Sequence, residues 1–473
     1  MANLPELPTE IILQILSHLS PSKADPFWSR GVTPQTLLPF FLTLDDESRT
    51  EQRENAKRLG LVCKKLWPVC MSIVWMRWES NLVLGLKNLL KVCKHNGRLA
   101  GCIQDLTIQL PYIPLEELES QLATIWPNTT SLHTLTLTLT PAYGCPSWLA
   151  TQLRAVPSLQ TLRLRVMGDS IGPYLRDLPN IHNLYVEVYP PDMEDHETDP
   201  LGPGPALEST IGENVGREVY HSWSALFNDL VGLIESCKNI TRLSWHVHWT
   251  MVHAFYRHSS FEGNTPSNHG LPIKCISTFP PFMTSLSISI ESQLGTEPFV
   301  RALSGLPITD LALVSYDHTL LLGTEFEKFC MAFKRLRRLK LKLRAPSITV
   351  GGGRPWLFSV DIEPIIRGLS SLPSLQSYRG PLVVKRPPPV PSITSSKLIR
   401  LEAKSVLAEL SRQLNANNVS PNALFQWCVW VDGKYGPKQF DTIPQGGPQR
   451  LDHIDEGVLK EPGSYQVNSL NTS

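Results

Sequence analysis

The sequence has almost no net charge and no long uninterrupted hydrophobic run. Lys and Arg total 44 against 43 Asp and Glu, which gives a net charge of +1. No global charge therefore draws the chain to nucleic acid or to an anionic membrane. Apolar runs such as residues 82–90 are broken by polar residues well short of the roughly 18 that a membrane helix needs. We expect neither nucleic acid nor a membrane as a partner.

Paired cysteine motifs are also lacking. The nine cysteines are scattered and include no CxxC pair, so the sequence indicates neither a disulfide framework nor a zinc site. No motif calls for a cofactor. Residues 1–10 lack the basic start and apolar core of a secretory signal. A reducing compartment, the cytoplasm or the nucleus, is the expected location.

The composition is that of a folded protein with many interrupted elements. Hydrophobic residues make up 42% of the 473 residues and charged residues 18%, which is typical of globular chains. The 40 prolines are nearly twice the number expected from an average usage of about 5%. The length favours two or three domains or one elongated repeat array.

Two separated motifs mark the N-terminal region. Apolar residues at helical spacing follow Leu7-Pro8-Thr9-Glu10 and predict a helix over residues 9–19. A later segment contains Val62-Cys63-Lys64-Lys65-Leu66-Trp67. The two motifs in this order resemble the F-box family. The resemblance implies a small three-helix module at residues 1–80, whose apolar face binds a Skp-type adaptor and, through it, a cullin ubiquitin ligase.

The positions that match the adaptor-binding motif are Leu7, Pro8, Ile11, Ile15, Leu16, Leu19, Val62, Cys63 and Trp67. Leu19 and Val62 are 43 positions apart, farther than in the usual motif, so an insertion follows the first helix. A module of three short helices cannot bury every apolar face by itself, which independently favours a partner. The alternative is that the apolar residues of the first helix are buried within a helical cap at the end of the remaining chain.

Short segments of alternating apolar and polar residues recur along the remaining chain and predict strands. They lie at 103–108, 132–137, 159–164, 181–186, 240–245, 286–288, 311–313, 336–341 and 398–401, with a last strand at 426–431. Helical stretches are expected between them, at 114–126, 147–156, 222–237, 298–306, 325–333 and 362–372. Proline- and glycine-rich segments at 190–216, 347–355 and 379–396 are expected to be loops.

The spacing of the strands is that of a repeat protein. Their central leucines at 106, 135, 162 and 184 are 29, 27 and 22 residues apart, within the roughly 20–29 of leucine-rich repeats. The pattern resembles the leucine-rich-repeat family. We therefore predict an α/β fold: a helical F-box module at 1–80, a βα horseshoe solenoid at 81–431, and a polar C-terminal tail at 432–473.

In strands of this type the leucines point inward and the residues between them face the concave surface. The candidates for binding a target protein, all expected to be exposed, are Arg163, Arg165, Tyr185, Glu187, His246, His248, Lys340 and Lys342, with Thr136, Thr138, Ser287 and Ser289 beside them. Their mixed chemistry suits protein recognition. Residues 334–344 hold seven basic side chains and no acidic one, which fits an acidic or phosphorylated peptide or an ordinary solvated strand face.

These features predict a non-catalytic substrate-recognition subunit of a Skp/cullin/F-box ligase, which needs no metal. One alternative is a leucine-rich-repeat scaffold that acts outside ubiquitination. Another is a serine hydrolase, because Gly168-Asp169-Ser170-Ile171-Gly172 matches the nucleophile pattern G-x-S-x-G. The strand before Gly168 belongs to the repeated series, which disfavours the hydrolase. His246 and His248 share a face but have no acidic or cysteine ligand near them in sequence, which disfavours a metal site.

Overall fold

The structure is a computed structural model of the whole chain. It describes residues 54, 56–58, 60–61, 66–80, 83–109, 115–139, 146–167, 175–189, 229, 231–247, 279–290, 297–315, 324–343, 362–384, 396–420, 423–431, 438–442 and 459–460.

The described strands form one sheet of 13 strands in sequence order. They are β1 (Arg77–Ser80), β2 (Asp105–Gln109), β3 (Thr134–Leu139), β4 (Thr161–Met167), β5 (Asn183–Tyr189), β6 (Arg242–Val247), β7 (Ser285–Ile290), β8 (Asp310–Ser315), β9 (Arg338–Leu343), β10 (Ser377–Val384), β11 (Leu424–Val431), β12 (Lys438–Thr442) and β13 (Leu459–Lys460). Strands β1 to β11 are parallel to one another, and β12 and β13 extend the sheet with antiparallel pairing.

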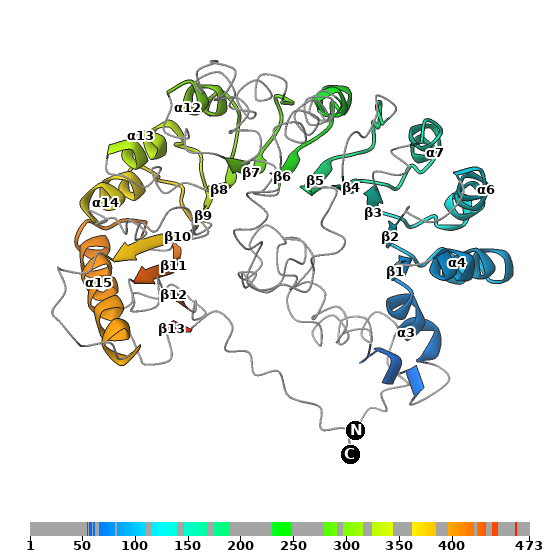
Figure 1. Cartoon of the computed structure of the whole chain (residues 1–473), viewed down its shortest axis with the longest axis horizontal. Coiled ribbons are helices and arrows are strands. Elements are labelled where there is room, and N and C mark those ends of the chain that lie inside the picture. The colour runs from blue at the N-terminus through cyan, green and yellow to red at the C-terminus, as the bar shows by residue number, and fades with distance from the viewer. Residues whose placement is uncertain are drawn as a thin grey trace, which may run out of the picture.

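Helices connect the parallel strands and lie outside them. They are α3 (Trp67–Val74), α4 (Val83–His95), α5 (Gly97–Ala100), α6 (Leu115–Ile125), the 3-10 turn η2 (Trp126–Asn128), α7 (Leu149–Arg154), α12 (Glu297–Ser304), α13 (Thr324–Ala332), α14 (Ile362–Ser370) and α15 (Ser396–Ala416). Figure 1 shows an arc whose inner side is lined by the strands and whose outer side carries the helices. The predicted α/β solenoid is therefore confirmed.

One carbonyl per repeat joins each strand to the next. The Gln104 carbonyl accepts the amide N–H groups of His133 and Thr134, both at 2.9 Å, and the His133 carbonyl accepts those of Gln160 and Thr161 at 3.0 and 2.9 Å. At each following pair of parallel strands, one carbonyl likewise accepts two consecutive amide N–H groups of the next strand's start, as far as the Arg337 carbonyl. Because the repeat is set by backbone groups, it tolerates different side chains and different connection lengths between strands.

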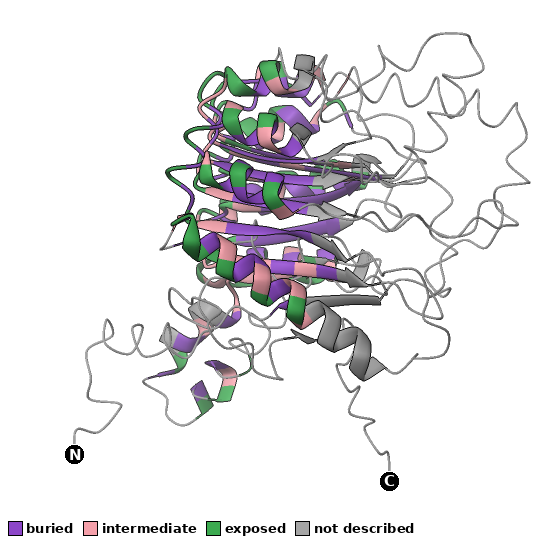
Figure 2. Cartoon of the chain, turned by 90° about the vertical axis from the view of Figure 1, so that its left-hand side faces the viewer, coloured by how far each residue is buried: buried purple, intermediate pink, exposed green. Residues whose placement is uncertain are grey.

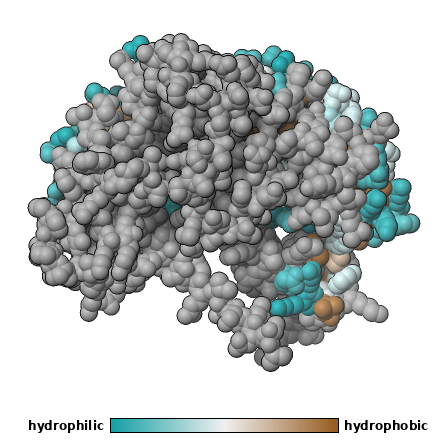
Figure 3. Space-filling model, viewed as in Figure 1, coloured by the Kyte–Doolittle hydropathy of each residue, from teal (hydrophilic) through white to brown (hydrophobic). Residues whose placement is uncertain are grey.

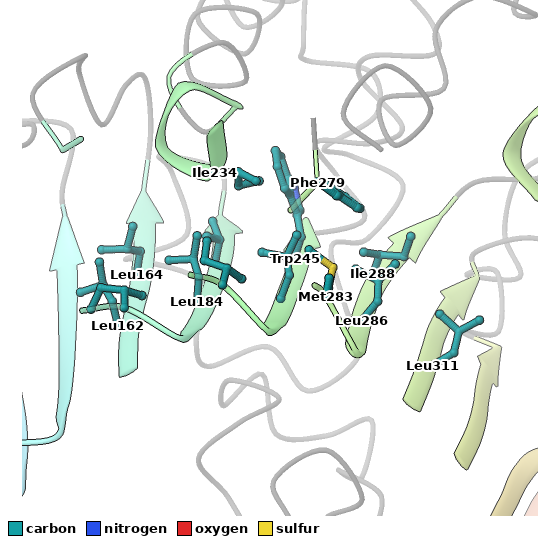
Figure 4. Packing of buried hydrophobic residues seen from close by; sticks show 14 of the residues in the cluster. Leu162, Leu164, Leu184, Ile234, Trp245, Phe279, Met283, Leu286, Ile288 and Leu311 are labelled. Atoms are coloured by element: carbon teal, nitrogen blue, oxygen red, sulfur yellow. The ribbon is translucent and has the colours of Figure 1, made fainter. Parts of the chain in front are cut away.

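The core lies between the strands and the helices. Leucines that occupy one register position in successive strands, such as Leu106, Leu135, Leu162 and Leu184, are 0% exposed. Figure 4 shows the inward side chains of neighbouring strands in contact, with Trp245 of β6 beside Met283 and Leu286. In Figure 2 the strands are largely buried, whereas the helices alternate between buried and exposed residues. This alternation is expected of an amphipathic helix that packs on a core.

The chain departs from the expected strand pattern near its C-terminal end. Segment 398–401, predicted as a strand, lies in α15, so that prediction is wrong. A short apolar run is compatible with either a strand or a helix. The residues that follow favour a helix, because Leu407, Leu410 and Leu414 are buried at helical spacing. The strand of this repeat is instead β10, which begins before the segment 379–396 that was expected to be a loop and extends into it.

The sheet also passes both ends of the range 81–431 that was expected to hold it. β1 already pairs with β2 from Arg77. At the other end, β12 and β13 lie within 432–473, the segment expected to be a polar tail. Their antiparallel pairing covers the free edge of β11 over residues 428–431, which protects an edge that would otherwise be open to another chain.

Candidate binding surfaces

The N-terminal candidate site is described only in part. Of the nine predicted adaptor-binding residues, Trp67 lies within the described residues and the other eight lie outside them. Trp67 is the first residue of α3 and is 44% exposed, while Leu66, Cys70 and Val74 are buried. Leu61 is 78% exposed. Figure 3 shows hydrophobic surface at this end of the molecule, where Figure 1 places α3.

The backbone of Gly60 packs against the ring of Trp67. A β-carbon at Gly60 would lie 3.0 Å from Cε3 of Trp67 and 3.3 Å from Cβ of Cys70. This close approach favours glycine, since a larger residue would have to push the indole aside. The indole is thus supported from one side and exposed on the other.

The helix that carries Trp67 connects directly to the sheet. Only Trp75 and Met76 separate α3 from β1. The rings of Trp75 and Trp78 are stacked, with centroids 5.2 Å apart and an interplanar angle of 19°. The Met76 carbonyl accepts the amide N–H groups of Gln104 and Asp105 at 2.7 and 3.0 Å. The two-residue connection after α3 is therefore tied to the first repeats by hydrogen bonds and ring contact.

The concave face is built from the strand residues that alternate with the buried leucines. One register position across β3 to β6 holds Thr136, Arg163, Tyr185 and Ser244, and the next position on the same face holds Thr138, Arg165, Glu187 and His246. The structure thus brings the sequence-predicted candidates of β3 to β6, together with Ser244, which was not predicted, onto one continuous surface. The surface is polar because no apolar side chain is required on this side of the strands.

Cross-strand pairs order this surface. The Arg163 guanidinium lies 5.5 Å from the ring centroid of Tyr185, a cation–π geometry. Beside it, Arg165 Nε lies 3.8 Å from a Glu187 carboxylate oxygen. Farther along, the His246 Nε2 atom and the Ser287 hydroxyl are hydrogen-bonded at 2.9 Å.

The expectation that these residues are exposed is wrong for every one whose side chain is described. Thr136, Thr138, Glu187, Ser287 and Lys340 are buried, and the other four, Arg163, Arg165, Tyr185 and His246, are intermediate. Side chains on neighbouring strands stand only about 4.8 Å apart, so short ones lie beneath longer neighbours. His248 lies outside the described residues, as do the side chains of Lys342 and Ser289.

A basic group lies on the same face near the C-terminal end. Lys340 of β9 and Arg379 of β10 are register partners and are both buried, at 3% and 8% exposure. Arg338 of β9 forms an ion pair with its register partner Asp310 of β8. Sequence reasoning missed Asp310 and Arg379, and it included Arg338 only as part of the basic stretch 334–344. Asp310 and Arg338 each directly precede the inward leucine of their strand. The alternation of the strand would have assigned this preceding position to the concave face.

The proposed nucleophile motif, residues 168–172, lies outside the described residues, immediately after the end of β4. In the described part of the chain, no group of three or more His, Cys, Asp and Glu is placed to hold a metal ion. None of the helices described there combines the length and apolar character that crossing a bilayer requires.

No protein-family model and no curated protein matches the sequence. Among solved structures, the chain is similar to the leucine-rich repeat-containing protein LegL7 from Legionella pneumophila. That match has 14% identity and a TM-score of 0.34, covering 76% of this chain and 92% of LegL7. The chain is also similar to the structure of the Rad7 and Elc1 complex from yeast, with 10% identity, a TM-score of 0.28, and coverage of 82% and 92%. We draw no functional conclusion from either likeness.

Proposed function

We propose that this chain is the substrate-recognition subunit of a Skp/cullin/F-box ubiquitin ligase. Its N-terminal helices bind the adaptor, and the concave face of the solenoid binds a target protein. The observation that carries the proposal is the exposure of Trp67, a position that the F-box resemblance assigns to adaptor binding. A tryptophan that is supported from behind by Gly60 and exposed in front is a typical interface anchor.

The role assigned to the chain is positional. A ligase receptor raises the effective concentration of its target near a ubiquitin-charged enzyme and needs no catalytic residue. The short connection from α3 to β1 fits this role, because it keeps the adaptor-binding end close to the first repeats. The same solenoid would also serve a scaffold that acts outside ubiquitination, which does not require Trp67.

The curved sheet fits the second half of the proposal. It presents guanidinium, carboxylate, imidazole, hydroxyl and phenol groups on one surface, and protein interfaces commonly combine such groups with aromatic anchors. Charged groups held in cross-strand pairs are positioned before a partner arrives, which lowers the entropy lost on binding.

Co-purification of the full-length chain with a Skp-type adaptor tests the proposal. We expect Leu16→Asp and Trp67→Ala to weaken the complex, Trp67→Ala by about 2 kcal/mol or about 30-fold in affinity, as for a central anchor. Phe282→Ala is the matched control, because Phe282 is 70% exposed in the turn before β7. Undiminished binding by both test variants would contradict the assigned face, and a wild-type chain that binds no adaptor would leave the scaffold function.

A further inference from the structure

Two threonines and two arginines form a compact group on the concave face. Thr136 and Thr138 of β3 are register partners of Arg163 and Arg165 of β4. The strands are about 4.8 Å apart and alternate residues of a strand about 6.6 Å apart, so the four α-carbons mark the corners of a small rectangle. Leu162 and Leu164 point into the core on the other side of β4 (Figure 4), which places both arginines on the concave side.

Each of the four side chains carries a buried polar atom without a hydrogen-bond partner. These atoms are Thr136 Oγ1, Thr138 Oγ1, Arg163 Nε and Arg165 Nη2. The two threonines are 1% and 7% exposed. Buried polar groups are nearly always satisfied in folded proteins, so four such atoms on adjacent residues of one face favour the binding of a polar group there.

The contacts already present leave these atoms available. Arg163 places the face of its guanidinium over the Tyr185 ring. Its N–H groups lie in the guanidinium plane, so this cation–π contact does not occupy them. Arg165 approaches Glu187 through Nε at 3.8 Å, and its unsatisfied atom is Nη2. Arginine can only donate hydrogen bonds, and a threonine hydroxyl can donate as well. All four atoms can therefore act as hydrogen-bond donors to an acceptor bound on this part of the face.

The chemistry of the group selects the ligand. Among the four residues and their register partners on β5, two guanidinium groups stand against one carboxylate, Glu187, so an anion is favoured over a cation. A second carboxylate, Asp105, lies on β2 at the level of Thr134, outside this group. A carboxylate or phosphate group offers several acceptor lone pairs within the span of the four side chains. Hydrogen bonds from guanidinium groups to such an oxyanion are charge-assisted and stronger than those to a neutral acceptor.

We propose that Thr136, Thr138, Arg163 and Arg165 form an oxyanion-binding site on the concave face. Its ligand is a carboxylate or phosphate group, supplied either by an acidic side chain of a bound polypeptide or by a small free anion. Where the anion is an acidic side chain, the site rests on the proposed target-binding role of the concave face. Its assay with inorganic phosphate needs neither adaptor nor target, so the two can fail separately.

Titration of inorganic phosphate into the purified full-length chain tests the site. Ionic strength is held constant with chloride, and heat of binding and thermal unfolding are recorded. We expect saturable binding by the wild type. The double variant Arg163→Gln/Arg165→Gln should bind at least tenfold more weakly. Arg242→Gln is the matched control, since Arg242 is an exposed arginine on β6 of the same sheet. The absence of saturable binding, or equal binding by the double variant, would overturn the proposal.

A second variant covers the case in which the arginine variant does not fold. Thr136→Val/Thr138→Val keeps the side-chain shapes and removes both unsatisfied hydroxyl groups. In chloride it should unfold at the same temperature as the wild type or higher, yet its phosphate affinity should fall several-fold. Unchanged affinity in this stable variant would contradict the assigned residues.

Synthetic peptides separate the two sources of the anion. A glutamate-rich peptide and its glutamine counterpart are each added to the phosphate-bound chain. Displacement of phosphate by the glutamate peptide alone assigns the site to an acidic side chain. Retention of phosphate against both peptides assigns the site to a small free anion.

Discussion

The hydroxyl group of Tyr378 lies over the backbone of Gly380, two residues farther along β10. A β-carbon at Gly380 would come within 2.0 Å of that oxygen and within 2.4 Å of Cζ. Tyr378 is the register partner of Leu339 and so occupies the inward leucine position of its repeat. The larger ring extends across the next inward position, and only glycine leaves room for it there.

Gly380→Ala should therefore destabilise the protein by about 1–3 kcal/mol, the usual cost of overpacking a core. Gly101→Ala is the control, because its nearest neighbour would be 3.4 Å away. Urea unfolding of both variants measures the difference. The double variant Tyr378→Leu/Gly380→Ala should lose less unfolding free energy than the sum of the losses in the two single variants, because leucine does not reach position 380. Simple additivity would contradict the proposed overlap.

A hydrogen bond between repeats gives a second prediction. Trp126 Nε1 donates to Gln152 Oε1 at 2.8 Å, which links η2 to α7, and Trp126 is 5% exposed. Gln152→Ala leaves this buried N–H without its acceptor, and we expect a loss of about 1–3 kcal/mol of unfolding free energy. Gln160→Ala, at an exposed position before β4, should change it little. Equal effects of the two variants would show that the bond contributes nothing.

Cysteine reactivity provides a third test. Burial raises the pKa of the Cys330 thiol well above its usual 9.0, and Cys330 is 0% exposed. Cys102, by contrast, is partly exposed. Because the thiolate is the reactive form, native protein at pH 8 should be alkylated at Cys102 well before Cys330, as peptide mass spectrometry would show. In denaturant the two rates should converge. Equal rates in the native protein would contradict the packing of this core.

The same burial predicts a dependence of stability on pH. Burial raises the pKa of Cys93 from 9.0 to about 11. Below pH 9 the thiol is neutral in both the folded and the unfolded chain, so its contribution to stability is complete. Between pH 9 and about 11 the unfolded chain ionises first, and this contribution is lost. Cys93→Ala should show a smaller decline in unfolding free energy over that interval than the wild type. An identical decline would show that Cys93 does not contribute.

Alternation of apolar and polar residues was enough to predict the βα solenoid, because the leucine positions of β2 to β5 follow the repeat closely. It failed at β10, where Tyr378 and Gly380 replace two leucine positions and Pro381 suggests a loop. Such compensation, in which a large ring fills the space left by a glycine two residues away, depends on packing and cannot be predicted from the apolar or polar character of single residues.

For the candidate surfaces, alternation assigned Arg163, Arg165 and Glu187 to one face but gave the wrong exposure. Exposure depends on neighbours from other strands that lie far away in sequence, such as Glu187 and His246, register partners 59 positions apart. The position of Trp67 on the surface could be anticipated only through the F-box resemblance.

Proximity labelling in cells tests adaptor binding by the N-terminal helices, with the intact chain compared with the double variant Leu16→Asp/Trp67→Ala. We predict that the intact chain labels a Skp-type adaptor and a cullin, and that the variant loses both while keeping its remaining partners. If adaptor and cullin are labelled equally by the two chains, or by neither, these helices do not recruit a ligase.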